Sequence, residues 1–147
     1  REGMEARMRI YKSELRVNYW DTDAMKVVYH GNYIKYFEYG RCEMMRQAGF
    51  PYQKLEEAGI MLPILSVSCE YRRPAVYDDL LEIHTIPDLY HGARLKLRYE
   101  IYRKETGELL VTGATVSGTV GTDMRPILLK KKFPQLHEMF LSLIEEE

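Results

Sequence analysis

The amino-acid sequence predicts an α+β fold in which one long helix covers one face of an antiparallel sheet. Apolar residues recur at helical spacing between about residues 30 and 48, which indicates a helix of about five turns. Beyond residue 62, apolar and polar residues alternate in several consecutive segments, which is typical of half-buried strands. A single long helix before a run of strands must bury its apolar stripe against the sheet that the strands form, and this arrangement is typical of the α+β class.

The N-terminal half is expected to form a strand, a loop and the long helix. The strand extends from about residue 7 to 20, and the loop comprises residues 21–29. The helix begins at residue 30 or 31 and ends at 48, where Gly49 and Pro51 provide a stop signal. Its apolar face is expected to consist of residues three or four positions apart: Tyr33, Phe37, Gly40, Met44 and Ala48.

The C-terminal half is expected to contain several strands between two helices. The expected elements, in order, are a helix over 51–58, strands over 62–72, 81–85, 94–102 and 108–120, and a helix over 133–147. The last two strands are joined at Thr106 and Gly107 as an antiparallel hairpin. One face of the last strand is expected to carry Leu110, Ala114, Val116 and Val120. The terminal helix is expected to be amphipathic through Leu136, Met139, Phe140 and Leu143.

Length and composition favour one domain spanning residues 1–147. Of the 147 residues, 46% are hydrophobic, which is enough to bury a core without disulfides or metal ions. Charged residues make up 29% of the chain but leave a formal net charge of -1. This balance does not favour nucleic acid or an anionic membrane as a partner, so an anionic ligand requires a local cationic patch.

Cysteine usage and hydropathy predict a soluble, cytoplasmic protein without a metal site. Cys42 and Cys69 lie in different expected elements and form no cluster with metal-ligand spacing. Unpaired cysteines are typical of a reducing compartment. No apolar run approaches the roughly 20 residues of a membrane-spanning helix, so no membrane insertion is expected. Residues 1–7 are expected to be disordered or a remnant of expression.

The loop before the long helix combines an acidic side chain with a helix start, which suits attack on an acyl group. Asp23 is expected near the helix N-terminus, where unpaired N–H groups and the helix dipole favour negative charge. The N–H groups around Tyr29, His30 and Gly31 can donate to a carbonyl oxygen on which charge develops. Hydrolysis of a thioester needs little more than these two parts, because a thiolate is a good leaving group.

Two segments of the chain resemble a known family. Residues 17–41 contain the runs Asp21-Thr-Asp-Ala and Val28-Tyr-His-Gly-Asn-Tyr, followed by Phe37-Glu and Arg41. The second segment, which is supportive only, is Arg73-Pro-Ala-Val-Tyr-Asp-Asp-Leu80. With the order of elements, they resemble the hotdog-fold 4-hydroxybenzoyl-CoA thioesterases and the short-chain acyl-CoA thioesterases associated with the Tol-Pal envelope system.

The resemblance implies a fold, a reaction and an assembly. It implies a hotdog fold, with an antiparallel sheet wrapped around one central helix, and hydrolysis of small or medium acyl-CoA to CoA and a carboxylic acid. Asp23 matches the catalytic carboxylate, acting as nucleophile or general base, and His30 matches the residue whose backbone amide polarises the carbonyl. No cofactor is implied, because coenzyme A is part of the substrate. A homodimer or homotetramer with active sites at a dimer interface is also implied.

Several loop residues have alternative readings. Asp21 is expected to satisfy turn amides, and Asn32 to sit at the helix start. The His30 ring either takes part in catalysis, caps the helix or hydrogen-bonds Asp23. Lys26 stands where the family usually has glycine, so either the loop bends differently or Lys26 contacts an anionic part of the substrate. The candidate substrate-binding residues are Tyr29, Gly31, Asn32, Lys26, Leu62, Pro63, His91 and Arg94.

Three basic clusters are candidates for binding the CoA phosphates. They are Arg94 with Lys96 and Arg98, Arg72 with Arg73, and Lys130 with Lys131 and Lys132. Two other functions stay open. A hotdog hydratase or dehydratase is one, although its His-Phe-Pro-Gly-type motif is absent. The other is a non-catalytic acyl-CoA-binding or envelope-assembly scaffold, against which the intact Asp23 and helix start argue.

Overall fold

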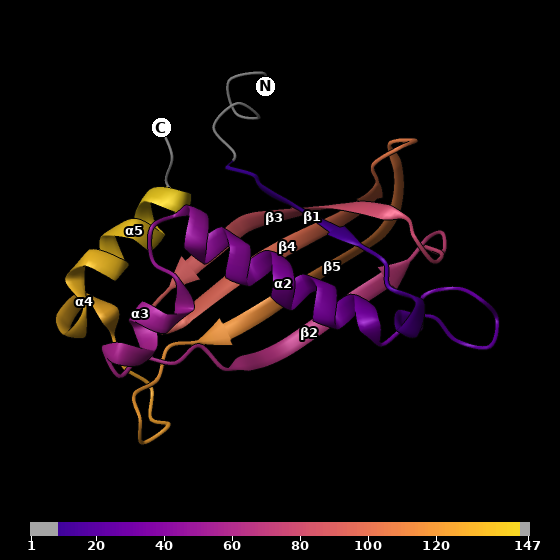
Figure 1. Cartoon of the computed structure of the whole chain (residues 1–147). Coiled ribbons are helices and arrows are strands. Elements are labelled where there is room, and N and C mark those ends of the chain that lie inside the picture. The colour runs from indigo at the N-terminus through magenta and orange to yellow at the C-terminus, as the bar shows by residue number, and fades with distance from the viewer. Residues whose placement is uncertain (1–8, 145–147) are drawn as a thin grey trace.

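The long helix lies across one face of a five-stranded antiparallel sheet (Figure 1). The computed structural model describes residues 9–144, so the expectations for residues 1–7 and 145–147 lie outside the described residues. The strands are β1 (Tyr11–Arg16), β2 (Ile64–Tyr71), β3 (Leu80–His91), β4 (Arg94–Arg103) and β5 (Glu108–Gly118). The helices are η1 (Tyr19–Asp21), α2 (Asn32–Gln47), α3 (Tyr52–Glu57), α4 (Leu129–Lys132) and α5 (Pro134–Ile144). The strand order is β1-β3-β4-β5-β2, which makes β1 and β2 the sheet edges.

Helix α2 packs on the sheet through the stripe that its spacing predicts. Its buried residues include Tyr33, Phe37, Gly40 and Met44. The Phe37 ring stacks on Tyr99 of β4 with centroids 4.5 Å apart. Gly113 of β5 makes room for this ring, because a Cβ at Gly113 would lie 2.4 Å from Phe37. The helix is therefore fixed on the sheet at the central strands, and its N-terminus lies at one end of them.

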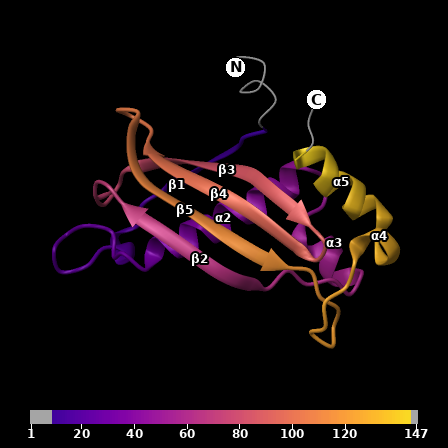
Figure 2. The same ribbon diagram turned by 180° about the vertical axis from the view of Figure 1, so that it is seen from behind.

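The two ends and the second face of the sheet differ in their covering. Helices α3, α4 and α5 gather at one end, and the loop before α2 projects at the other (Figure 1). The view from behind shows no helix of the described chain over the second face (Figure 2). Helix α5 packs on β3 and buries Leu136, Phe140 and Leu143, which confirms the amphipathic pattern. No helix within residues 9–144 has the length and apolar character needed to cross a membrane.

The predicted order of the strands is confirmed, but several details differ. Strand β3 extends to His91 instead of ending at residue 85, and the short helix α4 was not predicted. The first strand ends at Arg16 instead of Trp20, and residues 19–21 form the short helix η1. A local hydrogen-bonded turn ends the strand early. The Asn18 N–H donates to the Asp21 carboxylate at 3.3 Å, and the Asp21 N–H donates to the Asn18 carbonyl at 3.0 Å. Side chains of this type compete with strand formation by capturing nearby amides.

The predicted buried face of β5 is wrong for part of the strand. In the second half of β5, Thr115 and Ser117 are buried, whereas Ala114 and Val116 are only half-buried. The register with β4 shifts between Ile101 and Tyr102, and this leaves Leu110 as an extra residue on β5. An extra residue in one strand exchanges the two faces beyond it, because side chains alternate with a period of two.

Candidate active site

The loop between η1 and α2 is closed by main-chain hydrogen bonds. The Tyr29 N–H donates to the Asp21 carbonyl at 2.9 Å, and the Asp23 N–H donates to the Val27 carbonyl at 2.9 Å. The Lys26 N–H donates to the Asp23 carbonyl at 2.8 Å, which makes a tight turn at the tip. Lys26 has a φ of 66°, a left-handed conformation that costs a side-chain-bearing residue more than glycine.

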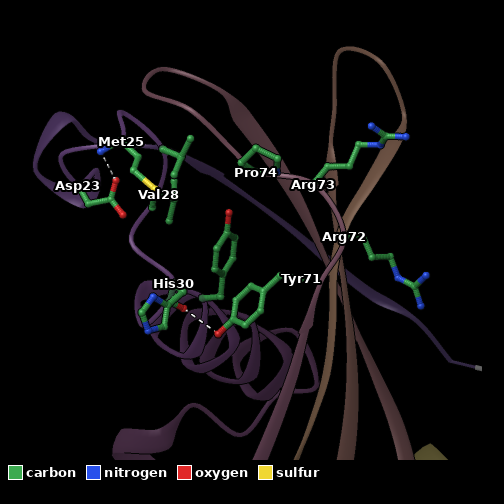
Figure 3. Close-up of a pocket in the computed structure, with 10 residues that line it drawn as sticks. Asp23, Met25, Val28, His30, Tyr71, Arg72, Arg73 and Pro74 are labelled. Atoms are coloured by element: carbon green, nitrogen blue, oxygen red, sulfur yellow. Dashed lines mark hydrogen bonds between the residues drawn. The ribbon is translucent and has the colours of Figure 1, made fainter.

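Asp23 lines a cavity of about 230 Å³ at the N-terminal end of α2. Its Oδ1 accepts a hydrogen bond from the Met25 N–H at 2.9 Å (Figure 3). Among residues 9–144, no donor reaches Oδ2 within hydrogen-bonding distance. Because a carboxylate has two acceptor oxygens, one oxygen of Asp23 holds the loop and the other is available to a ligand.

The start of α2 presents two unpaired backbone amides. The Asn32 N–H donates to the Tyr29 carbonyl at 2.9 Å, and the Tyr33 N–H makes a longer bond of 3.4 Å to the His30 carbonyl. Within the described part of the chain, the N–H groups of His30 and Gly31 have no hydrogen-bond acceptor. Free N–H groups are expected at a helix N-terminus and attract negative charge. The region expected to supply oxyanion donors therefore contains two unpaired N–H groups.

The walls of the cavity come from three segments that are distant in sequence. The lining residues are Asp23, Met25, Val27, Val28, His30, Tyr33, Tyr71, Arg72, Arg73 and Pro74. Tyr71, the last residue of β2, donates a hydrogen bond from its hydroxyl to the His30 carbonyl at 3.1 Å (Figure 3). The centroids of the Tyr71 and Tyr33 rings are 5.6 Å apart. Interaction with the Cys69 thiol, with burial, raises the pKa of Tyr71 to about 12, so the phenol stays protonated as a donor. Tyr71 thus ties the helix start to the sheet.

The structure brings together part of the predicted site. Asp23 and His30 line the same cavity, and His30 places its exposed ring at a distance of 4.5 Å from the Tyr29 ring. Lys26, Gly31 and Tyr29 belong to the same loop but do not line the cavity, and neither does Asn32. The Asn32 side chain instead donates to the Asp21 carbonyl at 2.8 Å, in keeping with its expected place at the helix start.

The other predicted substrate-binding residues lie toward the opposite end of the sheet. Leu62 is buried, and its carbonyl accepts a hydrogen bond from Arg41 at 2.9 Å. Pro63 follows it, immediately before β2. His91 and Arg94, at the turn between β3 and β4, line a separate hollow of about 450 Å³ together with Leu65. Within one protomer, these four residues are not in the cavity that contains Asp23.

The basic clusters have different surroundings. Arg72 and Arg73 line the Asp23 cavity, but their side chains point away from Asp23 in Figure 3, and Arg73 pairs with Glu108 at 2.9 Å. Lys96 and Arg98 both lie 3.6 Å from Asp88, which offsets part of their charge. The three lysines of the third cluster lie in or beside α4, at the end of the molecule far from the loop.

Sequence reasoning missed Tyr71, Met25 and Val28 as walls of the cavity. Tyr71 precedes the basic pair at the end of an extended segment, which is the one local signal for it. Its position beside His30 arises from the pairing of β2 with β5 and from the placement of α2 on the sheet. No local pattern records those long-range contacts.

An antiparallel sheet packed against one long central helix is the arrangement of the hotdog fold. Among solved structures, the DHNA-CoA thioesterase from Staphylococcus aureus matches with a TM-score of 0.87 and 32% identity, covering 91% of this chain and 90% of that chain. The 4-hydroxybenzoyl-CoA thioesterase from Pseudomonas sp. strain CBS-3 shares the fold, with a TM-score of 0.79 and 22% identity over 89% of this chain and 99% of that chain.

Sequence comparison gives the family. Residues 17–142 match the model of the thioesterase-like superfamily, and the chain belongs to this family. The putative acyl-CoA thioesterase YneP of Bacillus subtilis is 31% identical over 134 residues, 90% of this chain and 96% of that protein. The acyl-CoA thioester hydrolase YbgC of Escherichia coli is 33% identical over 122 residues, 83% of this chain and 91% of that protein. The predicted hotdog fold and thioester hydrolase class are confirmed.

Proposed function

We propose that this thioester hydrolase releases CoA and a carboxylic acid from small or medium acyl-CoA substrates. The observation that carries the proposal is that Asp23, with one free carboxylate oxygen, lines the same cavity as His30, whose unpaired N–H is followed by the unpaired N–H of Gly31. The names of YneP and YbgC support acyl-CoA as the substrate class. We also propose that the enzyme works in the cytoplasm, where acyl-CoA is found and where unpaired cysteines persist.

The geometry suits a substrate whose carbonyl oxygen lies against the helix start. The His30 and Gly31 N–H groups donate to that oxygen and stabilise the charge that develops on it during attack. The Asp23 carboxylate either attacks the carbonyl carbon to give a mixed anhydride, which water then hydrolyses, or removes a proton from the attacking water. In both routes the carbon–sulfur bond breaks, the CoA thiolate leaves, and the acyl group takes up hydroxyl from water.

The size and lining of the cavity favour a small acyl group. At about 230 Å³, the cavity lies below the range of roughly 300–1,000 Å³ that is typical of sites for whole drug-sized ligands. Its apolar walls include Val28, Tyr33 and Pro74, which suit hydrocarbon or an aromatic ring. One protomer therefore provides room for the acyl end of the substrate, whereas the pantetheine and nucleotide parts require other surface.

We propose that this other surface comes from a second copy of the chain paired along β2. This strand is a sheet edge, and it exposes the apolar residues Ile64, Leu65, Val67 and Tyr71. The opposite edge, β1, carries exposed charges at Lys12, Glu14 and Arg16, which disfavour pairing. Two β2 strands related by a two-fold axis run antiparallel and extend the sheet, as expected for a homodimer and for a homotetramer built from it.

Antiparallel pairing of the two β2 edges accounts for predicted site residues that lie at opposite ends of one sheet. It sets the Ile64 end of one β2 against the Tyr71 end of the other, so each Asp23 cavity adjoins the other copy's hollow beside Leu65. His91 and Arg94 line that hollow and would then face the CoA part of a substrate held by the other copy. Pro63, which immediately precedes β2, would lie along the same path.

The deciding experiment is thiol release from a panel of acyl-CoA substrates by wild type and Asp23→Asn. The variant is expected to lose at least about 100-fold in kcat, because the neutral amide neither attacks nor accepts a proton. Asp123→Asn is the matched control, since Asp123 Oδ1 accepts the Arg125 N–H at 3.0 Å in the same type of turn outside the cavity. Equal rates for folded wild type and Asp23→Asn would contradict the assignment. Tight acyl-CoA binding without any turnover would favour a binding module instead.

A further inference from the structure

The buried acid beside the candidate active site is Asp21, whose side chain the proposed reaction does not use. Asp21 is 3% exposed, and its carboxylate accepts three hydrogen bonds. Oδ2 accepts the Tyr36 hydroxyl at 2.9 Å and the Asn18 N–H at 3.3 Å, and Oδ1 accepts the Lys35 ammonium at 3.1 Å. Two of these donors belong to α2, and the third precedes η1. The side chain therefore joins the turn before the loop to the first turns of the helix.

The main chain of the same residue closes the other side of the loop. The Asp21 carbonyl accepts the Tyr29 N–H at 2.9 Å and the Asn32 side-chain N–H at 2.8 Å. Asp23 follows Asp21 by two positions, and His30 directly follows Tyr29. Asp21 thus contacts Asn18 ahead of the loop, Tyr29 directly before the free amides, and the helix that follows them. Asp21 itself does not line the cavity, so it does not contact the reacting atoms.

Ionisation of Asp21 makes these contacts complementary. Burial would raise the pKa of Asp21, but the hydrogen bonds from Lys35, Tyr36 and Asn18 together hold it below its ordinary value. Burial and contact with this carboxylate raise the pKa of Tyr36, which therefore remains a donor. A carboxylate matches three donors, whereas an asparagine side chain would turn N–H groups toward some of them.

We infer that Asp21 is a positioning residue that sets the Asp23 carboxylate against the His30 and Gly31 amides, through its contacts with Tyr36, Tyr29 and Asn32. The inference rests on the proposed function, because it assigns a task to Asp21 within that site. Its consequence is a loss of turnover without loss of substrate binding when the network is weakened. Small misplacements of reacting groups are known to cost up to about 100-fold in rate.

The sharpest test compares two tyrosines that each lose one buried hydroxyl. Tyr36 and Tyr99 are both 1% exposed, and Tyr99 hydrogen-bonds Thr115 at 2.8 Å on the sheet, away from the loop. Tyr36→Phe removes a contact to Asp21, and Tyr99→Phe is its matched control for a lost buried hydroxyl. We expect Tyr36→Phe to lower kcat about 10-fold with KM within about 2-fold, and Tyr99→Phe to change kcat by less than about 3-fold. Asp21→Asn is expected to lower kcat by about 100-fold.

A second readout does not depend on turnover. Trp20 is the single tryptophan of the chain and precedes Asp21 within η1, so its fluorescence anisotropy reports the order of this turn. The anisotropy is expected to fall in Tyr36→Phe and to stay unchanged in Tyr99→Phe. Equal losses of kcat in the two tyrosine variants, or an unchanged anisotropy in Tyr36→Phe, would overturn the inference. If wild type hydrolyses no acyl-CoA, the proposed function fails, and the anisotropy still decides whether Asp21 orders the loop.

Discussion

Asp21 and Asp23 are two positions apart, yet their surroundings prepare them for different tasks. Three donors occupy the buried carboxylate of Asp21: the Asn18 N–H is the expected turn amide, and the other two are side chains of α2. Asp23 receives one hydrogen bond and keeps a free oxygen toward the cavity. A carboxylate saturated with donors is a poor nucleophile and a poor base, because each donor stabilises its charge. The local surroundings therefore separate a positioning acid from a candidate catalytic one.

Lys26 gives a residue-scale prediction about stability. Its left-handed φ of 66° is strained for lysine, and Lys26→Gly should raise the free energy of unfolding by about 0.5–1 kcal/mol. Urea denaturation measures this change. Ala24→Gly is the control, since Ala24 lies in the same loop without a positive φ and should gain nothing. If Lys26 also contacts anionic substrate, KM will rise in Lys26→Gly. An unchanged KM would leave its backbone conformation as its only role.

Asp21 gives a prediction about pH. Its pKa is lowered from the ordinary value of 3.8 in the folded chain, so its contribution to stability is fully present above that value. The contribution is lost as the pH falls through the folded-state pKa, because the unfolded chain binds the proton more readily. Urea unfolding at several pH values between about 5 and 2.5 should therefore show wild type and Asp21→Asn converging in stability toward low pH. A constant difference across this range would contradict the assignment of a paired, ionised Asp21.

At the scale of elements, the close approach of α2 to β3 depends on Gly40, which has no side chain. A Cβ at Gly40 would lie 2.6 Å from Thr85 Oγ1 and 2.9 Å from Ile83 Cγ2. Alanine improves helix propensity by up to about 1 kcal/mol, but overpacking of a dense core typically costs 1–3 kcal/mol. The approach bears on the proposed function, because α2 begins two residues after His30, which lines the cavity.

We expect Gly40→Ala to be destabilising by about 1–2 kcal/mol, since the two contacts outweigh the gain in propensity. Thermal or urea unfolding measures the difference. The double variant with Thr85→Ala is expected to recover part of the loss, because the contacting hydroxyl is removed and it has no hydrogen-bond partner in the described chain. A Gly40→Ala variant more stable than wild type would show that the helix can shift without cost.

At the scale of the whole molecule, the unprotected edge β2 predicts self-association. Val67 on β2 and Val76 in the loop before β3 are each 41% exposed, so Val76 serves as the control position for Val67. Val67→Lys places a charge on the proposed interface and should shift the mass in sedimentation or light scattering toward the monomer, with a parallel loss of activity. Val76→Lys should leave both unchanged. A wild type that is monomeric yet fully active would contradict the proposal that two copies of the chain form each active site.

Local sequence determined the elements and the chemical groups of the site. Helical spacing in α2 and alternation in β4 reflect burial of one face, which is a property of short segments. The Asp23 loop, His30 and the helix start at Asn32 are close together in the chain, so one motif contains all three. For the same reason Asn32 was correctly expected at the helix start.

Only the tertiary structure decided how distant segments meet. The bulge at Leu110 reversed the expected face of β5, because register is set by pairing with β4 and not by the strand alone. Tyr71 became a wall of the site through the placement of α2 against β2. His91 and Arg94 lie far from Asp23 within one chain, because strand pairing sends the β3–β4 turn to the opposite end of the sheet. Contacts of this kind depend on register and packing, which no short stretch of sequence contains.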